Sequence, residues 1–279
     1  MRSSYTCGVA IGALLAATIT SASAANITVS PSAAGLSDAA NFSFEGIRTS
    51  DFSSIDLTSV GSGNFSFKEI GFLPIATFDP GNFTPPGLNG SPTATPYGLY
   101  LAFSGTGLLA PVAGDLQGSF NRLTYAVMGD LGFNSSFNHF DSSHQVFCVG
   151  CSGDVTLATG TLLSGGTNSI GIIQASTANP LPSAFVDLTF DGESSKFFVS
   201  PSVPFRIALD TQFSNTSDVI TQYTTDLSPG VDQVVNIGTL GNVGGAGSGQ
   251  FVEVSEPKSM GLLGASLVCL GLVRRRFQG

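Results

Sequence analysis

The residues of this chain best suited to metal or redox chemistry are gathered in one short segment. Its two histidines and two of its four cysteines fall within thirteen residues, at His139, His144, Cys148 and Cys151. Thiolate and imidazole groups are zinc ligands, and a Cys-x-x-Cys pair is common in zinc sites. In an exported protein such a pair usually oxidises to a disulfide, and in a thioredoxin-like protein it is redox-active. Three interpretations are therefore open: a structural disulfide, a metal site and a redox motif.

We predict the disulfide between Cys148 and Cys151. Val149 and Gly150 can turn the chain, so that the second cysteine comes back beside the first. The spacing of the two histidines is not a familiar zinc spacing, and no βαβ pattern surrounds the cysteines as a redox motif would need. The metal alternative would use both cysteines together with one or both of His139 and His144. We predict no bound cofactor.

The same segment contains the residue types of a hydrolase without a recognisable arrangement. His139, Asp141 and Ser142 are close in sequence, but the members of a catalytic triad meet in space. No Gly-x-Ser-x-Gly elbow accompanies them. We therefore predict that the protein is not an enzyme and has no catalytic residues. The alternative that stays open is an exported carbohydrate-active or metal-dependent hydrolase with its site around residues 139–151.

Strands must position these residues, because apolar and polar residues alternate with period two along most of the chain. The word Asn-Phe-Ser-Phe occurs in 41–47 and again in 64–70, and each copy places two phenylalanines on one face. Further strands are expected at 55–60, 97–103, 120–127, 155–163, 169–174, 184–190, 205–213, 219–225 and 233–237. Turn residues separate them at spacings typical of a sandwich. We predict an all-β, β-sandwich or jelly-roll-like ectodomain over residues 25–237.

Composition limits the partners of this ectodomain. Residues 25–255 contain five basic side chains against eighteen acidic ones, so the surface repels nucleic acid and anionic membranes. The chain has 42% hydrophobic residues, which argues against disorder. We predict no nucleic-acid partner.

The first residues have the pattern of a secretory signal peptide. Arg2 supplies a positive start, residues 7–19 are almost wholly apolar or small, and Ala22-Ser23-Ala24 is an A-x-A cleavage site. We therefore predict a signal peptide over residues 1–24.

The last residues have the pattern of a membrane-sorting signal. Glu256-Pro257 is followed by an apolar run at 260–273 and then by Arg274, Arg275 and Arg276 in the basic tail 274–279. The run is shorter than the ~20 residues of a comfortable transmembrane helix, so it suits transient retention in a bilayer. The arginines should stay cytoplasmic by the positive-inside bias.

The order of these three parts over residues 255–279 resembles the PEP-CTERM sorting signal of exported bacterial proteins. The resemblance implies processing near Pro257 by an exosortase-like transpeptidase after transient anchoring in the membrane. Ser255 stands where the usual motif has proline, so membrane targeting follows from the resemblance more directly than cleavage does.

The ectodomain resembles the flocculation-associated PEP-CTERM proteins in the segments 96–107, 162–166, 185–190 and 204–207. That resemblance implies a cell-surface or extracellular-matrix protein of adhesion or biofilm, associated with exopolysaccharide and lacking catalytic residues.

Residues 238–254 are rich in glycine, and we predict a flexible linker that holds the ectodomain away from the membrane.

Overall fold

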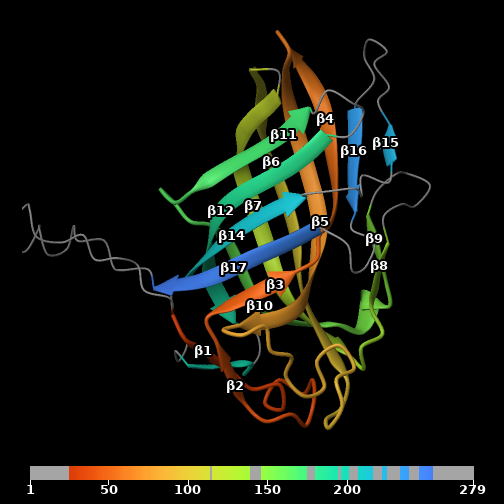
Figure 1. The fold of residues 1–279 in the computed structure, drawn as a ribbon, viewed down its shortest axis with the longest axis vertical. Helices are drawn as coiled ribbons and strands as arrows, with labels where there is room; N and C mark the ends of the chain where they lie inside the picture. The colour runs from red at the N-terminus through yellow and green to blue at the C-terminus, as the bar shows by residue number, and fades with distance from the viewer. Residues whose placement is uncertain are drawn as a thin grey trace, which may run out of the picture.

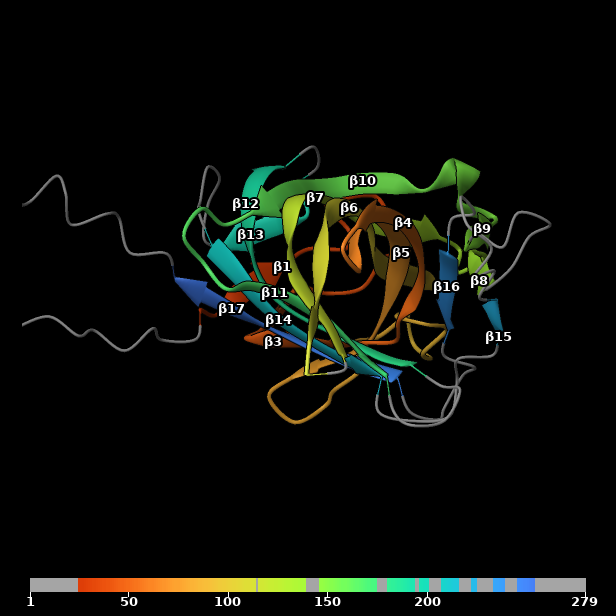
Figure 2. The same ribbon diagram turned by 90° about the horizontal axis from the view of Figure 1, so that it is seen from above.

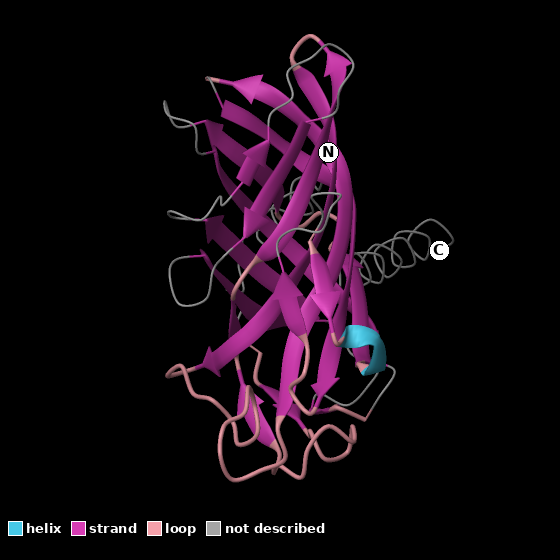
Figure 3. Cartoon of the chain, turned by 90° about the vertical axis from the view of Figure 1, so that its right-hand side faces the viewer, coloured by secondary structure: helices cyan, strands magenta, loops and turns pink. Residues whose placement is uncertain are grey.

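The structure of the chain is a computed structural model, which describes residues 25–113, 115–138, 146–174, 180–193, 196–200, 207–215, 222–224, 233–238 and 245–253. The regular secondary structure of these residues is almost entirely antiparallel strand (Figure 3), so the all-β prediction is confirmed. The predicted signal peptide, the sorting signal with Glu256, Pro257, Arg274, Arg275 and Arg276, and both histidines lie outside the described residues. Within the described residues, no helix is long and apolar enough to span a membrane.

The strands vary from three to seventeen residues, and the longest are three successive strands in the middle of the chain. They are β1 (Ile27–Val29), β2 (Phe42–Phe44), β3 (Gly46–Thr49), β4 (Phe52–Gly61), β5 (Asn64–Asp79), β6 (Tyr97–Val112), β7 (Asp115–Leu131), β8 (Ser136–Asn138), β9 (Phe147–Val149), β10 (Val155–Leu162), β11 (Asn168–Gln174), β12 (Pro180–Glu193), β13 (Phe198–Ser200), β14 (Ile207–Asn215), β15 (Gln222–Thr224), β16 (Gln233–Gly238) and β17 (Gly245–Glu253). Cys151–Gly153 form a 3-10 turn, η1.

The pairings of the main sheet return to their starting point. From β5 they pass through β6 and β7 to β10 and β11, which both pair with β12, and then through β14, β17 and β3 back to β5. Every one of these pairings is antiparallel. Figures 1 and 2 show the strands arranged around a common interior. We call this set of strands the closed ring; β4, β16 and β15 extend it on one side.

Alternation along each strand decides which side chains enter the interior. On β5, Phe67, Leu73 and Ile75 are buried, whereas Lys68 between them is exposed. Aliphatic and aromatic side chains of β3, β5, β6, β7, β10, β11, β12 and β17 belong to one continuous core. Because a hydrophobic side chain gains roughly 1.5–3 kcal/mol on full burial, this core is the main source of stability.

A small sheet of β13, β1 and β2 lies at one end of the closed ring, the lower end in Figure 1. Phe44 on β2 is buried against Phe78 and Phe251 of the ring. Phe198 on β13 is buried beside them. These phenylalanines line a small cavity of about 20 Å³ whose walls are apolar throughout. The small sheet therefore closes this end of the ring with aromatic side chains.

The prediction of a flexible linker over residues 238–254 is wrong for residues 245–253. These residues form β17, which pairs with β14 on one side and with β3 on the other. Strand pairing uses backbone N–H and C=O groups, so a glycine-rich segment can occupy a central position in a sheet. The close approach also favours glycine, since a Cβ at Gly46 of β3 would lie 2.7 Å from the Gly249 carbonyl oxygen. Residues 239–244 lie outside the described residues.

Candidate functional site

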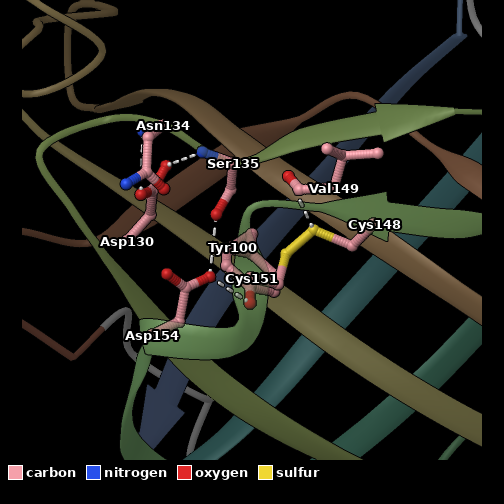
Figure 4. Close-up of a disulfide and its surroundings, with 8 residues drawn as sticks. All are labelled: Tyr100, Asp130, Asn134, Ser135, Cys148, Val149, Cys151 and Asp154. Atoms are coloured by element: carbon pink, nitrogen blue, oxygen red, sulfur yellow. Dashed lines mark hydrogen bonds between the residues drawn. A yellow bond between two sulfur atoms is a disulfide. The ribbon is translucent and has the colours of Figure 1, made fainter.

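The two cysteines predicted to pair lie at a corner between β9 and β10. A disulfide joins Cys148 and Cys151, whose Cα atoms are 5.9 Å apart (Figure 4). Gly150 makes the turn between them with φ 90°, a value that side chains disfavour. A Cβ at Gly150 would also lie 2.5 Å from the Asn134 carbonyl oxygen, so the turn has no room for a larger residue.

The disulfide removes both sulfurs from any set of thiolate ligands, because a metal-bound cysteine must be a thiolate. The other members of the predicted metal alternative, His139 and His144, lie outside the described residues. Across the part of the chain that is described, no group of three or more histidine, cysteine, aspartate or glutamate residues is placed to hold a metal ion.

Asp154, directly after η1, ties the disulfide corner to the ring. Its Oδ2 accepts hydrogen bonds from the Tyr100 hydroxyl of β6 at 2.7 Å and from the Ser135 hydroxyl at 2.9 Å (Figure 4). Burial, and then the bond to the Asp154 carboxylate, raise the pKa of Tyr100 above its usual range. Tyr100 therefore acts as a neutral donor that fixes the corner, and Ser135 is committed to the same carboxylate.

Asp130 at the end of β7 holds the other side of this corner. It is 2% exposed, and its two carboxylate oxygens accept the backbone N–H groups of Asn134 and Ser135, each at 3.0 Å. A carboxylate engaged in this way stabilises a turn. Both acidic residues of the corner thus have structural partners, and the corner is built for rigidity.

A second polar cluster lies inside the closed ring and was not identified from the sequence. Glu69 of β5 is 7% exposed and pairs in register with Ile55, so it projects among core residues. Its Oε2 has no hydrogen-bond partner, and neither has the Oγ of Ser53 in the same interior. The alternation Phe65, Phe67, Glu69 was the available signal, because it places the glutamate on the face of two phenylalanines.

Burial perturbs the ionisation of this interior cluster. Desolvation, and then the charge of Asp51, raise the pKa of Glu69 from 4.5 to about 8. Desolvation also raises the pKa of Asp51, from 3.8 to about 7. The polar hydroxyl of Ser53 lies near both carboxyls and partly offsets the rise of both pKa values. Its Oγ forms no hydrogen bond to either carboxyl. With its pKa raised in this way, the Glu69 carboxyl is neutral at neutral pH. Glu69 does not line the apolar cavity near the small sheet.

The outer surface of the ring has a different character. Four hydroxyl side chains on four strands are directly opposite one another: Ser104 on β6 pairs with Thr124 on β7, Thr124 with Thr161 on β10, and Thr161 with Thr189 on β12. All four are exposed or half-buried. The Thr161 and Thr189 hydroxyls lie 3.2 Å apart, and the Thr124 hydroxyl donates to the Ser104 carbonyl oxygen at 3.4 Å. We call this set the hydroxyl row.

The hydroxyl row was missed because it is a product of register. Thr124 and Thr189 are far apart in sequence, and only the strand pairing places them two strands from each other. Neighbouring strands are about 4.8 Å apart, so the row offers a hydroxyl at each such step across the sheet.

No known protein family, curated protein or solved structure matches this chain. The fold and the described residues define the class of the molecule as an antiparallel all-β protein with a closed ring, a largely apolar interior and a hydroxyl-bearing outer face. Any function beyond this class has to be argued from the chemistry of its surfaces.

Proposed function

We propose that this chain is an exported cell-surface or extracellular-matrix protein of adhesion or biofilm, and that its ectodomain binds exopolysaccharide. The hydroxyl row carries this proposal. Ser104, Thr124, Thr161 and Thr189 lie in one line across four strands. In this proposal the ectodomain is a sandwich-like unit that displays one polar face.

The chemistry of a hydroxyl matches that of a sugar. Each hydroxyl donates one hydrogen bond and accepts others, so it can satisfy a sugar hydroxyl in either direction. A polysaccharide laid across the strands meets one such group about every 4.8 Å. Since each net hydrogen bond contributes only about 1 kcal/mol, binding depends on several being made together.

The sorting part of the proposal is supported by the sequence at both ends. A signal peptide over 1–24 would export the chain, and the PEP-CTERM-like segment 255–279 would retain it in the membrane until an exosortase-like enzyme acts near Glu256-Pro257. Intact-mass measurement of the protein released from cells tests this sequence of events. Retention of residues 255–279 in the released protein would contradict it.

The hydrolase alternative around residues 139–151 stays a prediction, because His139 and His144 lie outside the described residues. In the neighbouring corner, the described carboxylates of Asp130 and Asp154 are occupied by structural hydrogen bonds. No observation in the described part of the chain favours this alternative over display.

Binding of the mature protein to exopolysaccharide from the producing cells tests the display function. Replacing Thr124 and Thr161 together with valine keeps their shape and removes two hydroxyls, so we expect binding to weaken by about tenfold. Thr28→Val on β1 is the matched control, because its hydroxyl bonds Ser43 on the small sheet, outside the row. Equal binding by all three proteins would contradict the proposal.

A further inference from the structure

A second row of outward-facing side chains runs beside the hydroxyl row and contains two cations. Lys68 on β5 pairs in register with Thr106 on β6, and Thr106 pairs with Arg122 on β7. All three side chains are exposed. Two strand spacings separate the backbones of Lys68 and Arg122, roughly 9.5 Å.

The two rows form one surface. Thr106 and Arg122 are each two residues from a member of the hydroxyl row, Ser104 on β6 and Thr124 on β7. Residues two apart on a strand share a face and are separated by about 6.8 Å along it. The cations therefore border the hydroxyls directly. A polymer that lies on the hydroxyl row at β6 and β7 passes within reach of both.

The position of these cations is informative because basic residues are scarce. Arg48 is paired with Asp79, its Nε lying 3.4 Å from the carboxylate. Lys196 lies before β13, near the small sheet. Acidic residues are found toward both sides of the face: Asp56 is opposite Lys68 on β4, and Asp187 on β12 accepts the Thr167 N–H. Among the described residues of β5, β6, β7, β10 and β12, the basic side chains are thus Lys68 and Arg122.

We propose that the ligand of this face is an acidic polysaccharide, one that carries carboxylate groups along its chain. Lys68 and Arg122 would contact carboxylates, and the adjoining hydroxyl row would bind sugar hydroxyls. This inference rests on the proposed function and adds the class of polysaccharide to it. The remainder of the acidic surface repels such a polymer, so the two cations determine where it lies.

Arginine and lysine contribute differently at this surface. The Arg122 guanidinium can bond both oxygens of one carboxylate, which sets orientation as well as position. Lys68 acts as a mobile point charge on a long side chain, and Asp56 beside it repels a polymer that would continue over β4. The polymer is therefore directed from Lys68 toward β7 and β10, where the hydroxyl row continues, and Asp187 on β12 limits it on the other side.

The competing occupant of a cationic surface is an anionic membrane. Recognition of acidic lipids generally uses clusters of about four to eight basic residues. This face has two, and its polar neighbours are hydroxyls. The observations favour a polysaccharide, and the experiment distinguishes the two.

The test compares two forms of one polymer, polygalacturonate and its fully methyl-esterified derivative, which differ in charge and share a backbone. Binding of the mature protein is measured by affinity electrophoresis or surface immobilisation at about 50 mM and about 500 mM salt. We expect the acidic form to bind about tenfold more tightly at low salt and the preference to disappear at high salt, because exposed charges are screened.

The variants decide which residues cause the preference. Lys68→Gln combined with Arg122→Gln should remove it, so that this variant binds the acidic polymer and the ester with similar affinity. Lys196→Gln, which removes one positive charge elsewhere, should retain the preference. Melting temperatures within a few degrees of the parent protein establish that the variants fold.

Each other outcome has a defined meaning. Ester binding that depends on Thr124 and Thr161 but shows no charge preference overturns this inference and leaves the proposed function intact. Loss of the preference in Lys196→Gln to the same extent also overturns it, because the effect would then be one of net charge. Tighter binding to vesicles containing anionic phospholipid than to polygalacturonate assigns the face to a membrane. Binding to neither polymer overturns this inference, whereas the proposed function is overturned only if exopolysaccharide from the producing cells also fails to bind.

Discussion

Lys68 and Glu69 are neighbours in sequence and experience opposite surroundings. The lysine projects from the outer face of β5 into solvent, whereas the glutamate projects into the interior of the closed ring. The outer position leaves a charge in water, and the inner one removes a carboxyl from water and raises its pKa to about 8. A step of one residue along β5 thus separates a charged side chain in water from a buried carboxyl group that the fold keeps protonated.

The same contrast applies to apolar residues on the neighbouring strand. Leu108 and Leu109 are adjacent on β6, yet the first is 51% exposed and the second 1% exposed. Outer positions can therefore change with little effect on folding and are available for binding. Inner positions carry the stability of the ring.

The largest effect is expected where this contrast is broken in the core. Leu109→Ala should lower the free energy of unfolding by about 3 kcal/mol, because it removes buried methyl groups and leaves a cavity. Leu108→Ala should lower it by less than about 1 kcal/mol, since its side chain is already half in water. Urea unfolding of both variants measures the difference. Equal losses would mean that the two faces of β6 are not inner and outer.

A pH-dependent effect is expected at Glu69. Its pKa is raised on folding from 4.5 to about 8, so the folded state holds a proton that the unfolded state releases, and stability falls as pH rises between these values. Glu69→Gln removes this dependence. Relative to the parent, the variant should be close in stability near pH 5 and more stable by roughly 3 kcal/mol near pH 8.

The neighbouring residue is the control for this measurement. Lys68→Gln changes an exposed charge, so its stability should differ from the parent by within about 0.5 kcal/mol at both pH values. Parallel stability curves for the parent and Glu69→Gln would show that Glu69 is ionised at neutral pH in the folded protein.

An intermediate effect is expected at the disulfide corner on the outside of the ring. Cys148 and Cys151 are three positions apart, so their bond closes a very short loop. Replacing both with serine should cost about 2 kcal/mol, less than the ~3 kcal/mol of a 15-residue loop, because the entropy removed from the unfolded chain decreases with loop length. Thermal unfolding with and without reductant measures this, and reduction of the parent should match the double variant. Two free thiols in the non-reduced protein, found by mass spectrometry, would contradict the bond.

The smallest effect is expected in the hydroxyl row. Thr161→Val removes an exposed hydroxyl and its bond to Thr189. Stability should then change by at most about 0.5 kcal/mol, as is usual for surface substitutions. Tyr125→Phe provides the inner counterpart, because its part-buried hydroxyl donates to the Thr189 carbonyl oxygen at 2.7 Å. Loss of that hydrogen bond should cost about 1 kcal/mol. A larger loss at Thr161 than at Tyr125, measured by urea unfolding, would assign the row a structural function.

Much of the strand content was predictable from alternation. The expected strands at 97–103 and 120–127 are parts of β6 and β7. β6 extends further at its C-terminal end, and β7 extends further at both ends. The short strands β1, β8, β9 and β13 were not predicted, because three residues are too few to establish a period. Two cysteines close in sequence were enough to suggest their pairing, since the candidate partners were few.

By itself, the sequence determined the all-β class and the inner and outer positions along each long strand, because alternation is a local property of side chains. It also contained the linear patterns on which the proposed sorting signals rest. Tertiary structure decided the register that aligns Ser104, Thr124, Thr161 and Thr189, and the closure of the ring through β17. Glycine-rich residues 245–249 had the composition of a linker. The backbone N–H and C=O groups that pair them with β14 and β3 are present in every residue, so the sequence carries no sign of this pairing. Pairing of that kind becomes visible only when the partner strands are in place.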